Sequence, residues 1–419
     1  MSRKYILITI VIFVTVGAVL AGLYFVTKND TSQTESEGEP QIFPFGKALE
    51  NISDRLFRVF GESEKLDLVD TTSDQDKTGA GKTFGSGLLR ELSTMSAVGA
   101  FATTTEGNNV SVFYVERETG HVYRTAIESL SKNRVTNTTI PGIQEALWGD
   151  GGESLIVRYV DENGVIKSFS GTIHISEKFD TAFQGSFLQD DITHIVASPA
   201  GTKIFTLFPF GKSTIGAISR FDNKEKKEVL VTPFPGWLAF WPSDDTLTLA
   251  TKASGETWGS LYSIDAKTGA IDKLLSKING LTALPSPDMK HILYSESADD
   301  FFATHIYDVS KRESLPFPLV TLPEKCVWST MNPVLLYCGV PQTITQGIYP
   351  DLWYQGVASF SDAIWEINIE TGAVDILAML VESAKQNIDV VNPFLNEDET
   401  YFIFTNKNNN TLWSLKITP

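Results

Sequence analysis

From about residue 96 onward, polar turns alternate with short apolar strands along the chain. Each turn combines Gly, Pro, Asn, Asp or Ser, which favour tight turns, and an apolar strand follows each one. The seven turns lie at residues 106–109, 149–152, 198–201, 243–246, 286–289, 329–333 and 396–399. Their centres, at 107, 151, 200, 244, 288, 331 and 398, are separated by 44, 49, 44, 44, 43 and 67 residues.

A period in the forties with four short strands per unit is typical of a β-propeller. Each unit can bury its faces only against its neighbours, so the repeats predict one all-β domain at residues 88–419. Counting turns gives seven blades, and six or eight blades also fit the spacing. Thr-Gly turns at 118–120, 267–269 and 370–372 should place Gly at positive φ and lead into fourth strands.

The last unit ends at residue 419 after its third strand. An incomplete blade would leave an unpaired sheet edge. We expect residues 88–93, which precede the first strand of blade one, to supply the missing fourth strand. This three-plus-one closure would tie both ends of the domain together.

The repeat strings resemble the TolB-like and WD-type propeller repeats, in which Ser-Pro-Asp-Gly joins two apolar strands and Asp-x-x-Thr-Gly follows a third. The best matches are Ser-Pro-Asp at 286–288, Ser-Pro-Ala-Gly at 198–201 and Asp-Ala-Lys-Thr-Gly at 265–269. The resemblance covers about residues 88–419 and implies a propeller that binds or scaffolds more often than it catalyses. Fold alone does not assign a function.

Residues 5–26 are uncharged and mostly apolar, and they are long enough to cross a hydrocarbon core of about 30 Å. Arg3 and Lys4 precede them, so residues 1–4 should stay cytoplasmic and the rest of this single-pass membrane protein should be exported. A signal peptide cleaved near Ala21 is the competing interpretation.

Two further segments separate residues 5–26 from the repeats. Residues 27–46 are polar and acidic, which predicts a flexible linker. Within residues 47–87, Leu49, Ile52, Leu56 and Phe60 fall at helical spacing and predict one amphipathic helix, followed by a loose connector.

Composition narrows the choice of partner. The chain has 34 Lys and Arg against 51 Asp and Glu, a formal net charge of -17. Such a charge repels phosphate backbones, so we expect no nucleic-acid partner. A protein, peptide or glycan of the cell envelope is the expected partner.

Cys326 and Cys338 are the two cysteines of the chain, and they lie six residues on either side of position 332, within the turn at 329–333. A regular hairpin centred there places them directly opposite each other, close to disulfide range. In an exported compartment we expect a disulfide, whereas two buried free thiols are the alternative.

The sequence offers no convergent catalytic set. Five histidines are scattered through different units without metal-ligand spacing, at His121, His174, His194, His291 and His305. There is no Gly-x-Ser-x-Gly elbow, and neither Gly-Lys-Ser/Thr string has the glycine that a phosphate loop requires five positions earlier. We therefore expect no metal, no cofactor and no catalytic residues; the alternative is an envelope hydrolase or lyase with a carboxylate-based site at the propeller mouth.

The irregular 67-residue step contains a long aromatic loop at residues 341–362, between the second and third strands of blade six. Such loops share one propeller face with the connections between blades. The candidate aromatic ligand-binding face comprises Phe208, Phe210, Trp258, Phe301, Phe302, Tyr349, Trp353 and Tyr354. Aromatic side chains in loops either bind partners or pack, so the loop is either a binding site or a plug over the axial opening.

Overall fold

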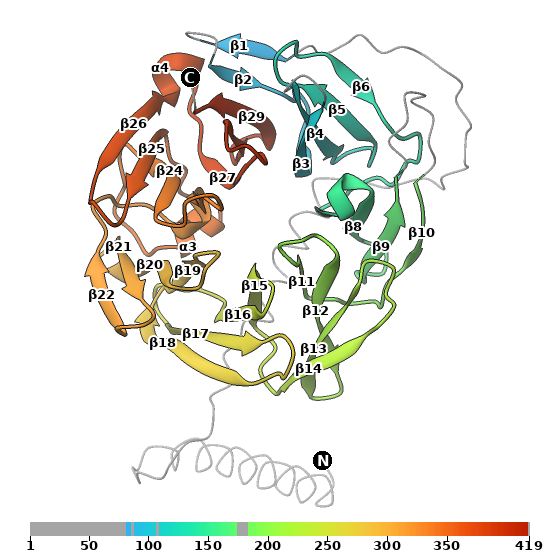
Figure 1. Cartoon of the computed structure of the whole chain (residues 1–419), viewed down its shortest axis with the longest axis horizontal. Coiled ribbons are helices and arrows are strands. Elements are labelled where there is room, and N and C mark those ends of the chain that lie inside the picture. The colour runs from blue at the N-terminus through green and yellow to red at the C-terminus, as the bar shows by residue number, and fades with distance from the viewer. Residues whose placement is uncertain (1–80, 85–87, 106–108, 174–182, 418–419) are drawn as a thin grey trace, which may run out of the picture. The chain divides into compact units, whose positions relative to one another are not determined.

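The computed structural model describes residues 81–84, 88–105, 109–173 and 183–417, all of which lie in one compact unit, Gln75–Pro419. Seven antiparallel sheets are arranged in a ring (Figure 1). The first strands of the blades, such as β3, β11 and β27, lie nearest the centre, and the fourth strands lie at the periphery. The fold is a seven-bladed β-propeller, as the turn count predicts.

Six blades have four strands each, and in each of these sheets neighbouring strands follow one another in the sequence. Blade one comprises β3 (Ala97–Thr105), β4 (Asn109–Glu116), β5 (Val122–Ala126) and β6 (Lys132–Arg134); blade two β7 (Glu145–Gly149), β8 (Ser154–Val160), β9 (Ile166–Thr172) and β10 (Gln184–Phe187); blade three β11 (His194–Ala197), β12 (Lys203–Phe210), β13 (Ser213–Arg220) and β14 (Lys227–Thr232). Blade four comprises β15 (Trp237–Ser243), β16 (Thr246–Thr251), β17 (Trp258–Asp265) and β18 (Ile271–Asn279); blade five β19 (Thr282–Pro285), β20 (His291–Ala298), β21 (Phe301–Asp308) and β22 (Glu313–Pro316); blade six β23 (Cys326–Trp328), β24 (Leu335–Pro341), β25 (Asp362–Asn368) and β26 (Val374–Met379).

Blade seven is completed from the amino-terminal side. Its sheet has the order β1-β2-β29-β28-β27, with β1 (Lys82–Phe84), β2 (Leu89–Glu91), β27 (Val390–Leu395), β28 (Tyr401–Asn406) and β29 (Thr411–Lys416). Leu89 pairs with Leu415 and Glu91 with Trp413, which confirms the predicted closure by residues 88–93. The sequence analysis does not predict the fifth strand, β1, because the segment around it is rich in Gly and Thr, which is typical of a loose connector.

The connections divide between two faces of the ring. The seven turns of the sequence pattern join the first and second strands of the seven blades, and connections between third and fourth strands lie on that same side, which we call the turn face. Antiparallel pairing places the connections between second and third strands, and those between blades, on the other side, which we call the loop face. One prediction was wrong: Gly120 has the expected positive φ of 73°, but it joins second and third strands rather than third and fourth.

Short irregular helices lie in the connections: η1 (Asp150–Gly152), η2 (Pro323–Lys325), α3 (Asp351–Tyr354) and α4 (Leu380–Ala384). The core consists of apolar layers between neighbouring blades. In blade seven, Trp413 is fully buried and stacks on Phe84 of β1 at 5.3 Å between ring centroids. Strand β1 therefore adds an aromatic contact outside the closing strand.

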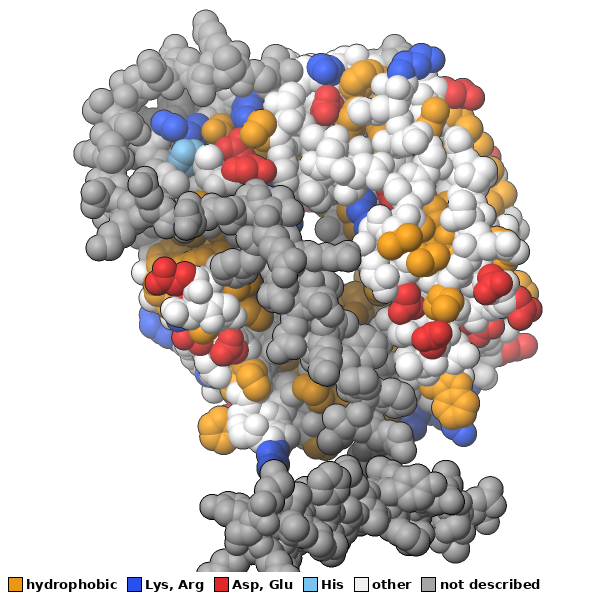
Figure 2. Space-filling model, turned by 180° about the vertical axis from the view of Figure 1, so that it is seen from behind, with side chains coloured by type: hydrophobic (Ala, Val, Ile, Leu, Met, Phe, Trp, Pro, Cys, Tyr) orange, Lys and Arg blue, Asp and Glu red, His pale blue; other side chains and the backbone are white. Residues whose placement is uncertain are grey.

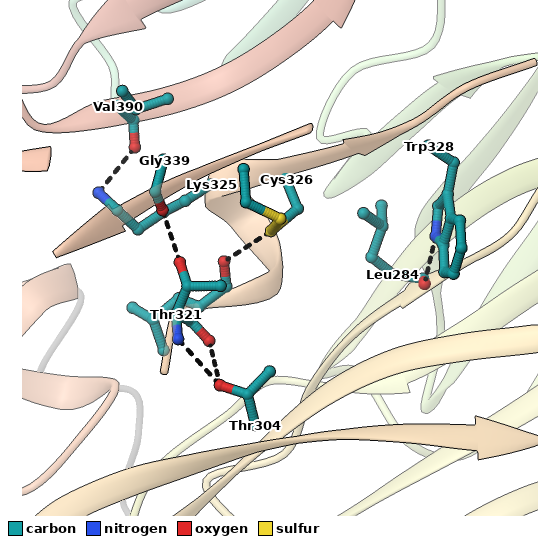
Figure 3. The surroundings of a disulfide bond; sticks show 10 residues. Leu284, Thr304, Thr321, Lys325, Cys326, Trp328, Gly339 and Val390 are labelled. Atoms are coloured by element: carbon teal, nitrogen blue, oxygen red, sulfur yellow. Dashed lines mark hydrogen bonds between the residues drawn. A yellow bond between two sulfur atoms is a disulfide. The ribbon is translucent and has the colours of Figure 1, made fainter. Parts of the chain in front are cut away.

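The predicted disulfide is present. Cys326 on β23 and Cys338 on β24 pair directly in register, are buried, and form a disulfide (Figure 3). Next to it, Trp328 Nε1 donates a hydrogen bond of 3.1 Å to the Leu284 carbonyl and links blades six and five. The disulfide lies in the sheet that carries the long loop.

The predictions for residues 1–80, including the membrane segment 5–26, the linker 27–46 and the helix within 47–87, lie outside the described residues. Within the part of the chain that the structure describes, no helix is long and apolar enough to span a membrane.

Candidate functional site

The long loop lies on the loop face between β24 and β25 and contacts three other blades. Asp351 accepts a hydrogen bond of 2.6 Å from the Gly255 amide in blade four, and the Gly347 amide donates one of 2.7 Å to the Asp300 carbonyl in blade five. Ser359 donates to Asn408 of blade seven at 2.5 Å. The loop thus spans four neighbouring blades, with α3 on the inner side of blade six (Figure 1).

A buried lysine lies under this loop. Lys325, at the end of η2, is fully buried and contacts two fully buried carboxylates: its Nζ is 2.7 Å from Asp362 and is also paired with Asp389. Nζ also donates to the Val390 carbonyl at 3.0 Å (Figure 3). A buried charge requires such partners, because removing it from water without them costs several kcal/mol.

Asp389 connects this charge cluster to the loop. It accepts hydrogen bonds from Trp353 Nε1 at 3.0 Å and from the Phe360 amide at 3.0 Å. The Lys325 ammonium lies 5.3 Å from the Trp353 ring centroid, within cation–π range. Lys325, Asp362 and Asp389, which we call the clasp, therefore hold the loop against the ring.

Burial changes the ionisation of the clasp. Desolvation raises the pKa of Asp362 to about 6, although the neighbouring Lys325 charge opposes the shift. The Oδ2 atom of Asp362 accepts from the Val390 amide at 2.6 Å, whereas Oδ1 is buried without a hydrogen-bond partner among the described residues. Asp362 is therefore the least satisfied member of the clasp.

Three of the predicted aromatic residues are buried together. Phe302, Tyr349 and Trp353 form a cluster with Phe360, in which Phe302 and Tyr349 have ring centroids 5.1 Å apart. Trp353 is only 2% exposed. These side chains pack the loop onto the ring, so they are not available to a ligand at the surface.

The other predicted aromatic residues are divided between core and surface. Phe208 is buried between blades two and three, in a cluster separate from that of Trp353. Phe210 is 71% exposed and Trp258 is 70% exposed, and Phe301 and Tyr354 are also exposed. The Tyr354 hydroxyl donates to Glu324, and burial raises the pKa of that carboxyl.

Four exposed apolar residues that the sequence analysis did not single out join these on the loop face. Phe234 and Val320 lie in connections between blades, and Ile348 and Val357 lie in the long loop. We call the eight residues the apolar rim; they are Phe210, Phe234, Trp258, Phe301, Val320, Ile348, Tyr354 and Val357. They occupy blades three to six and the connections between them. A search for apolar residues of every kind in the loop-face connections would have found them.

A cavity of about 350 Å³ lies at blades seven, one and two, away from the apolar rim. It is lined by the first strands of these blades, and its lining includes Arg117, Gln144, Glu145 and Asn392. We call it the axial cavity, because these first strands surround the centre of the ring (Figure 1). The sequence analysis did not find it, since its residues come from three blades.

The described histidines have structural partners. His194 Nε2 lies 2.9 Å from the Ala239 carbonyl, and burial lowers the pKa of its imidazole. His305 stacks on Tyr294 at 5.1 Å. Within the described ranges, no group of three or more His, Cys, Asp or Glu side chains is placed to hold a metal ion; His174 lies outside those ranges.

The face of the ring that is turned away in Figure 1 carries charges of both signs. Figure 2 shows acidic, basic and hydrophobic side chains interspersed over the described part of that face. Interspersed charges do not form the continuous basic surface that a phosphate backbone requires.

Comparison with known proteins identifies the fold. No family model and no curated relative matches the sequence. An oligogalacturonate lyase in complex with manganese is similar in structure, with a TM-score of 0.52, 11% identity, and coverage of 81% of this chain and 96% of that one. The oligogalacturonate lyase of Vibrio parahaemolyticus has a TM-score of 0.51 at 9% identity, with coverage of 81% of this chain and 98% of that one.

The β-propeller domain of the trilobed protease from Pyrococcus furiosus has a TM-score of 0.48 at 11% identity, covering 76% of this chain and 98% of that domain. Identities this low show a shared fold and not a shared activity. The TolB-like and WD-type resemblance is thus supported as a propeller fold and not as a family. The chain is a seven-bladed β-propeller similar in architecture to the oligogalacturonate lyases.

Proposed function

We propose that the protein is a binding or scaffold module that recognises another protein through the apolar rim of its loop face. The exposed rim is the observation that carries this proposal. Eight large apolar side chains from four neighbouring blades remain in water on one face. Burying one such side chain fully gives about 1.5–3 kcal/mol, so a partner that covers several of them gains considerable affinity.

The kinds of side chain in the rim favour a protein or peptide over a glycan. Trp258 and Tyr354 would suit either partner, because sugars also stack on aromatic rings. Val320, Ile348 and Val357 offer branched aliphatic surface, which packs against apolar side chains and gives little to a hydroxylated sugar. A protein surface with its own apolar residues therefore fits the rim best.

The clasp disfavours the alternative of a carboxylate-based hydrolase or lyase. Asp362 and Asp389 both pair with Lys325, but all three side chains are fully buried beneath the loop. Catalytic acids and bases must reach the substrate directly or through one water molecule. In the axial cavity, the Glu145 carboxylate is paired with Arg158. The ion pairs of the clasp and the Glu145–Arg158 pair therefore stabilise the fold.

We further propose that the module faces an oxidising compartment and is tethered by residues 5–26. The Cys326–Cys338 disulfide supports export, because disulfides persist mainly outside the reducing cytosol. The apolar run at 5–26 and the positive residues before it support a single-pass anchor with the propeller outside the cytoplasm. The proposed partner is accordingly a protein of the cell envelope.

The test compares two exposed aromatic residues of the apolar rim with one exposed residue of the opposite face. Trp258→Ala with Phe210→Ala removes the most exposed aromatic side chains of the rim, and Met331→Ala, 71% exposed on the turn face, is the matched control. Each full-length variant is used as bait in envelope extract, and any recovered protein is purified and titrated against all three chains. We expect the rim variant to bind at least about tenfold more weakly and the control to bind normally.

The stability of both variants should remain within about 0.5 kcal/mol of the wild type, because exposed residues contribute little to folding. Equal affinity for the wild type and the rim variant would reject the apolar rim as the binding surface. Turnover of a substrate by the wild type and the rim variant alike would favour the enzymatic alternative.

A further inference from the structure

The axial cavity contains an arginine without an acidic partner. Arg117 follows β4, and its guanidinium has no salt bridge among the described residues. Its Nε is buried and has no hydrogen-bond partner in that part of the chain. The backbone of Arg117 is fixed, because its amide donates to the Ser96 carbonyl at 2.9 Å and its carbonyl accepts from Ile143 at 3.0 Å. The cavity lining thus contains a guanidinium without an acidic partner, on a residue whose backbone is fixed by hydrogen bonds.

The one carboxylate in the cavity lining does not neutralise this cation. Glu145 is paired with Arg158, whose side chain is 7% exposed and which also donates to the Ile192 carbonyl. That pair is neutral as a unit, so the charge of Arg117 remains uncompensated. An unpaired, partly buried guanidinium favours an anionic ligand, and a planar carboxylate matches its geometry with two parallel hydrogen bonds.

Strand β3 is the edge strand of its sheet and lies beside Arg117 in the cavity lining. Two of its backbone groups there already have partners: the Ala97 amide donates to the Asn410 carbonyl at 2.8 Å, and the Gly99 carbonyl accepts from Trp148 Nε1 at 3.1 Å. Small residues line the cavity at this point, namely Ala97, Gly99 and Ala100. Their small side chains leave room for an extended chain beside the guanidinium, so the contacts of a ligand would come mainly from side chains.

Bulges shape the strands at this point. The pairing of β3 with β4 shifts register at Gly99, which has φ +55° and lies so close to blade two that an added Cβ would be 2.0 Å from the Ala146 carbonyl oxygen. The pairing of β27 with β28 shifts register near Asn392, whose φ is +51°. β-Bulges are over-represented beside functional sites, where they redirect side chains.

We propose that the axial cavity binds the carboxyl terminus of an extended peptide, with the terminal carboxylate on Arg117. The side-chain amide of Asn392 and the side-chain oxygen of Gln144 would meet peptide N–H and C=O groups, whereas Gln144 Nε2 already donates to the Gly142 carbonyl at 3.2 Å. The cavity volume of about 350 Å³ is within the range of ligand sites. A sugar acid fits less well, because Phe394 is the single aromatic residue in the described lining and offers a limited stacking surface. This site is separate from the apolar rim, which occupies blades three to six, so either proposal can fail alone.

The experiment titrates the full-length chain with three probes by saturation-transfer NMR. The probes are acetyl-trialanine with a free carboxylate, the same peptide with a terminal amide, and D-glucuronate. The variants are Arg117→Met and Arg117→Lys, with Arg220→Met as the control, because Arg220 is exposed on the turn face and is 56% accessible. Melting temperatures verify that each variant is folded.

We expect acetyl-trialanine to bind the wild type and Arg220→Met equally, and to bind Arg117→Met at least about tenfold more weakly, because a charge-assisted contact is lost. Arg117→Lys should bind with intermediate affinity, and amidation should reproduce the loss in the wild type. Equal binding of the amide and the carboxylate, unchanged binding by Arg117→Met, or no binding at tens of millimolar peptide would overturn the proposal. Arg117-dependent binding of D-glucuronate tighter than that of the peptide would reject a peptide as the occupant.

Discussion

Blades seven and six are both irregular, and they are held together by different forces. Blade seven is completed by backbone pairing, in which β2 from the start of the domain pairs with β29 at its end. Blade six keeps four regular strands, and its long loop is held by the side chains of the clasp. Backbone pairing depends on a local alternating pattern, whereas the clasp depends on three residues that are distant in sequence. The first arrangement can therefore be recognised in a sequence, and the second cannot.

The largest effect should come from removing the closing strand. Deleting residues 88–93 leaves one edge of β29 unpaired and removes the buried Leu89 and Leu92. Because every blade packs on the next, we expect loss of cooperative unfolding of the whole domain. Thermal unfolding followed by circular dichroism measures this loss, and deletion of residues 29–40 is the control. A deletion variant that melts like the wild type would show that backbone closure is dispensable.

A smaller loss should follow from breaking the clasp. Lys325→Met leaves the carboxylates of Asp362 and Asp389 buried without their cation, which should lower the free energy of unfolding by about 3–5 kcal/mol. Lys311→Met is the matched control: Lys311 also pairs with an aspartate, Asp308, but its side chain is 70% exposed, so its loss should change stability far less than the loss of Lys325. Urea unfolding measures both, and equal losses would show that burial does not strengthen the clasp.

The smallest effect concerns the pH dependence of the clasp. The pKa of Asp362 is raised by burial to about 6 in the folded chain, above the ordinary value of 3.8. The folded state therefore binds this proton more tightly than the unfolded state, and this contribution to stability is complete below about pH 4 and is lost as the pH rises through 6. The change is about 3 kcal/mol at most.

Asp362→Asn removes the titrating group and keeps the hydrogen-bond acceptor for the Val390 amide. The difference in unfolding free energy between wild type and variant should shift in favour of the variant from pH 4 to pH 7. Urea unfolding at several pH values gives this difference. Parallel stability curves for the two proteins would contradict the raised pKa.

The fold could be predicted because its determinants are short and repeated. Turn residues at a spacing near 44 give the blade count, and the third strand at the end of the chain requires a partner such as residues 88–93. The disulfide followed from the symmetric placement of Cys326 and Cys338 about a turn. Each of these inferences needs only one hairpin or one repeat.

The candidate site was less predictable because it depends on contacts across blades. The sequence analysis grouped Trp353 and Trp258 on one face, but it could not show that Trp353 is buried and Trp258 exposed. That outcome depends on Asp389, 36 residues from Trp353, which accepts its indole hydrogen bond. Arg117 is equally inconspicuous in sequence, since its lack of a partner results from the pairing of Glu145 with Arg158.

The additional strand β1 has a mechanical consequence. Lys82 pairs with Glu91 and Phe84 with Leu89, so β1 lies outside the closing strand and is the first described element of the chain. A pull on the preceding residues would open the Lys82–Glu91 pair first and then peel β1 from β2 one pair at a time. Tension applied to the residues before β1 would therefore have to separate the three residue pairs between β1 and β2 before it reached β2, the strand that closes the ring.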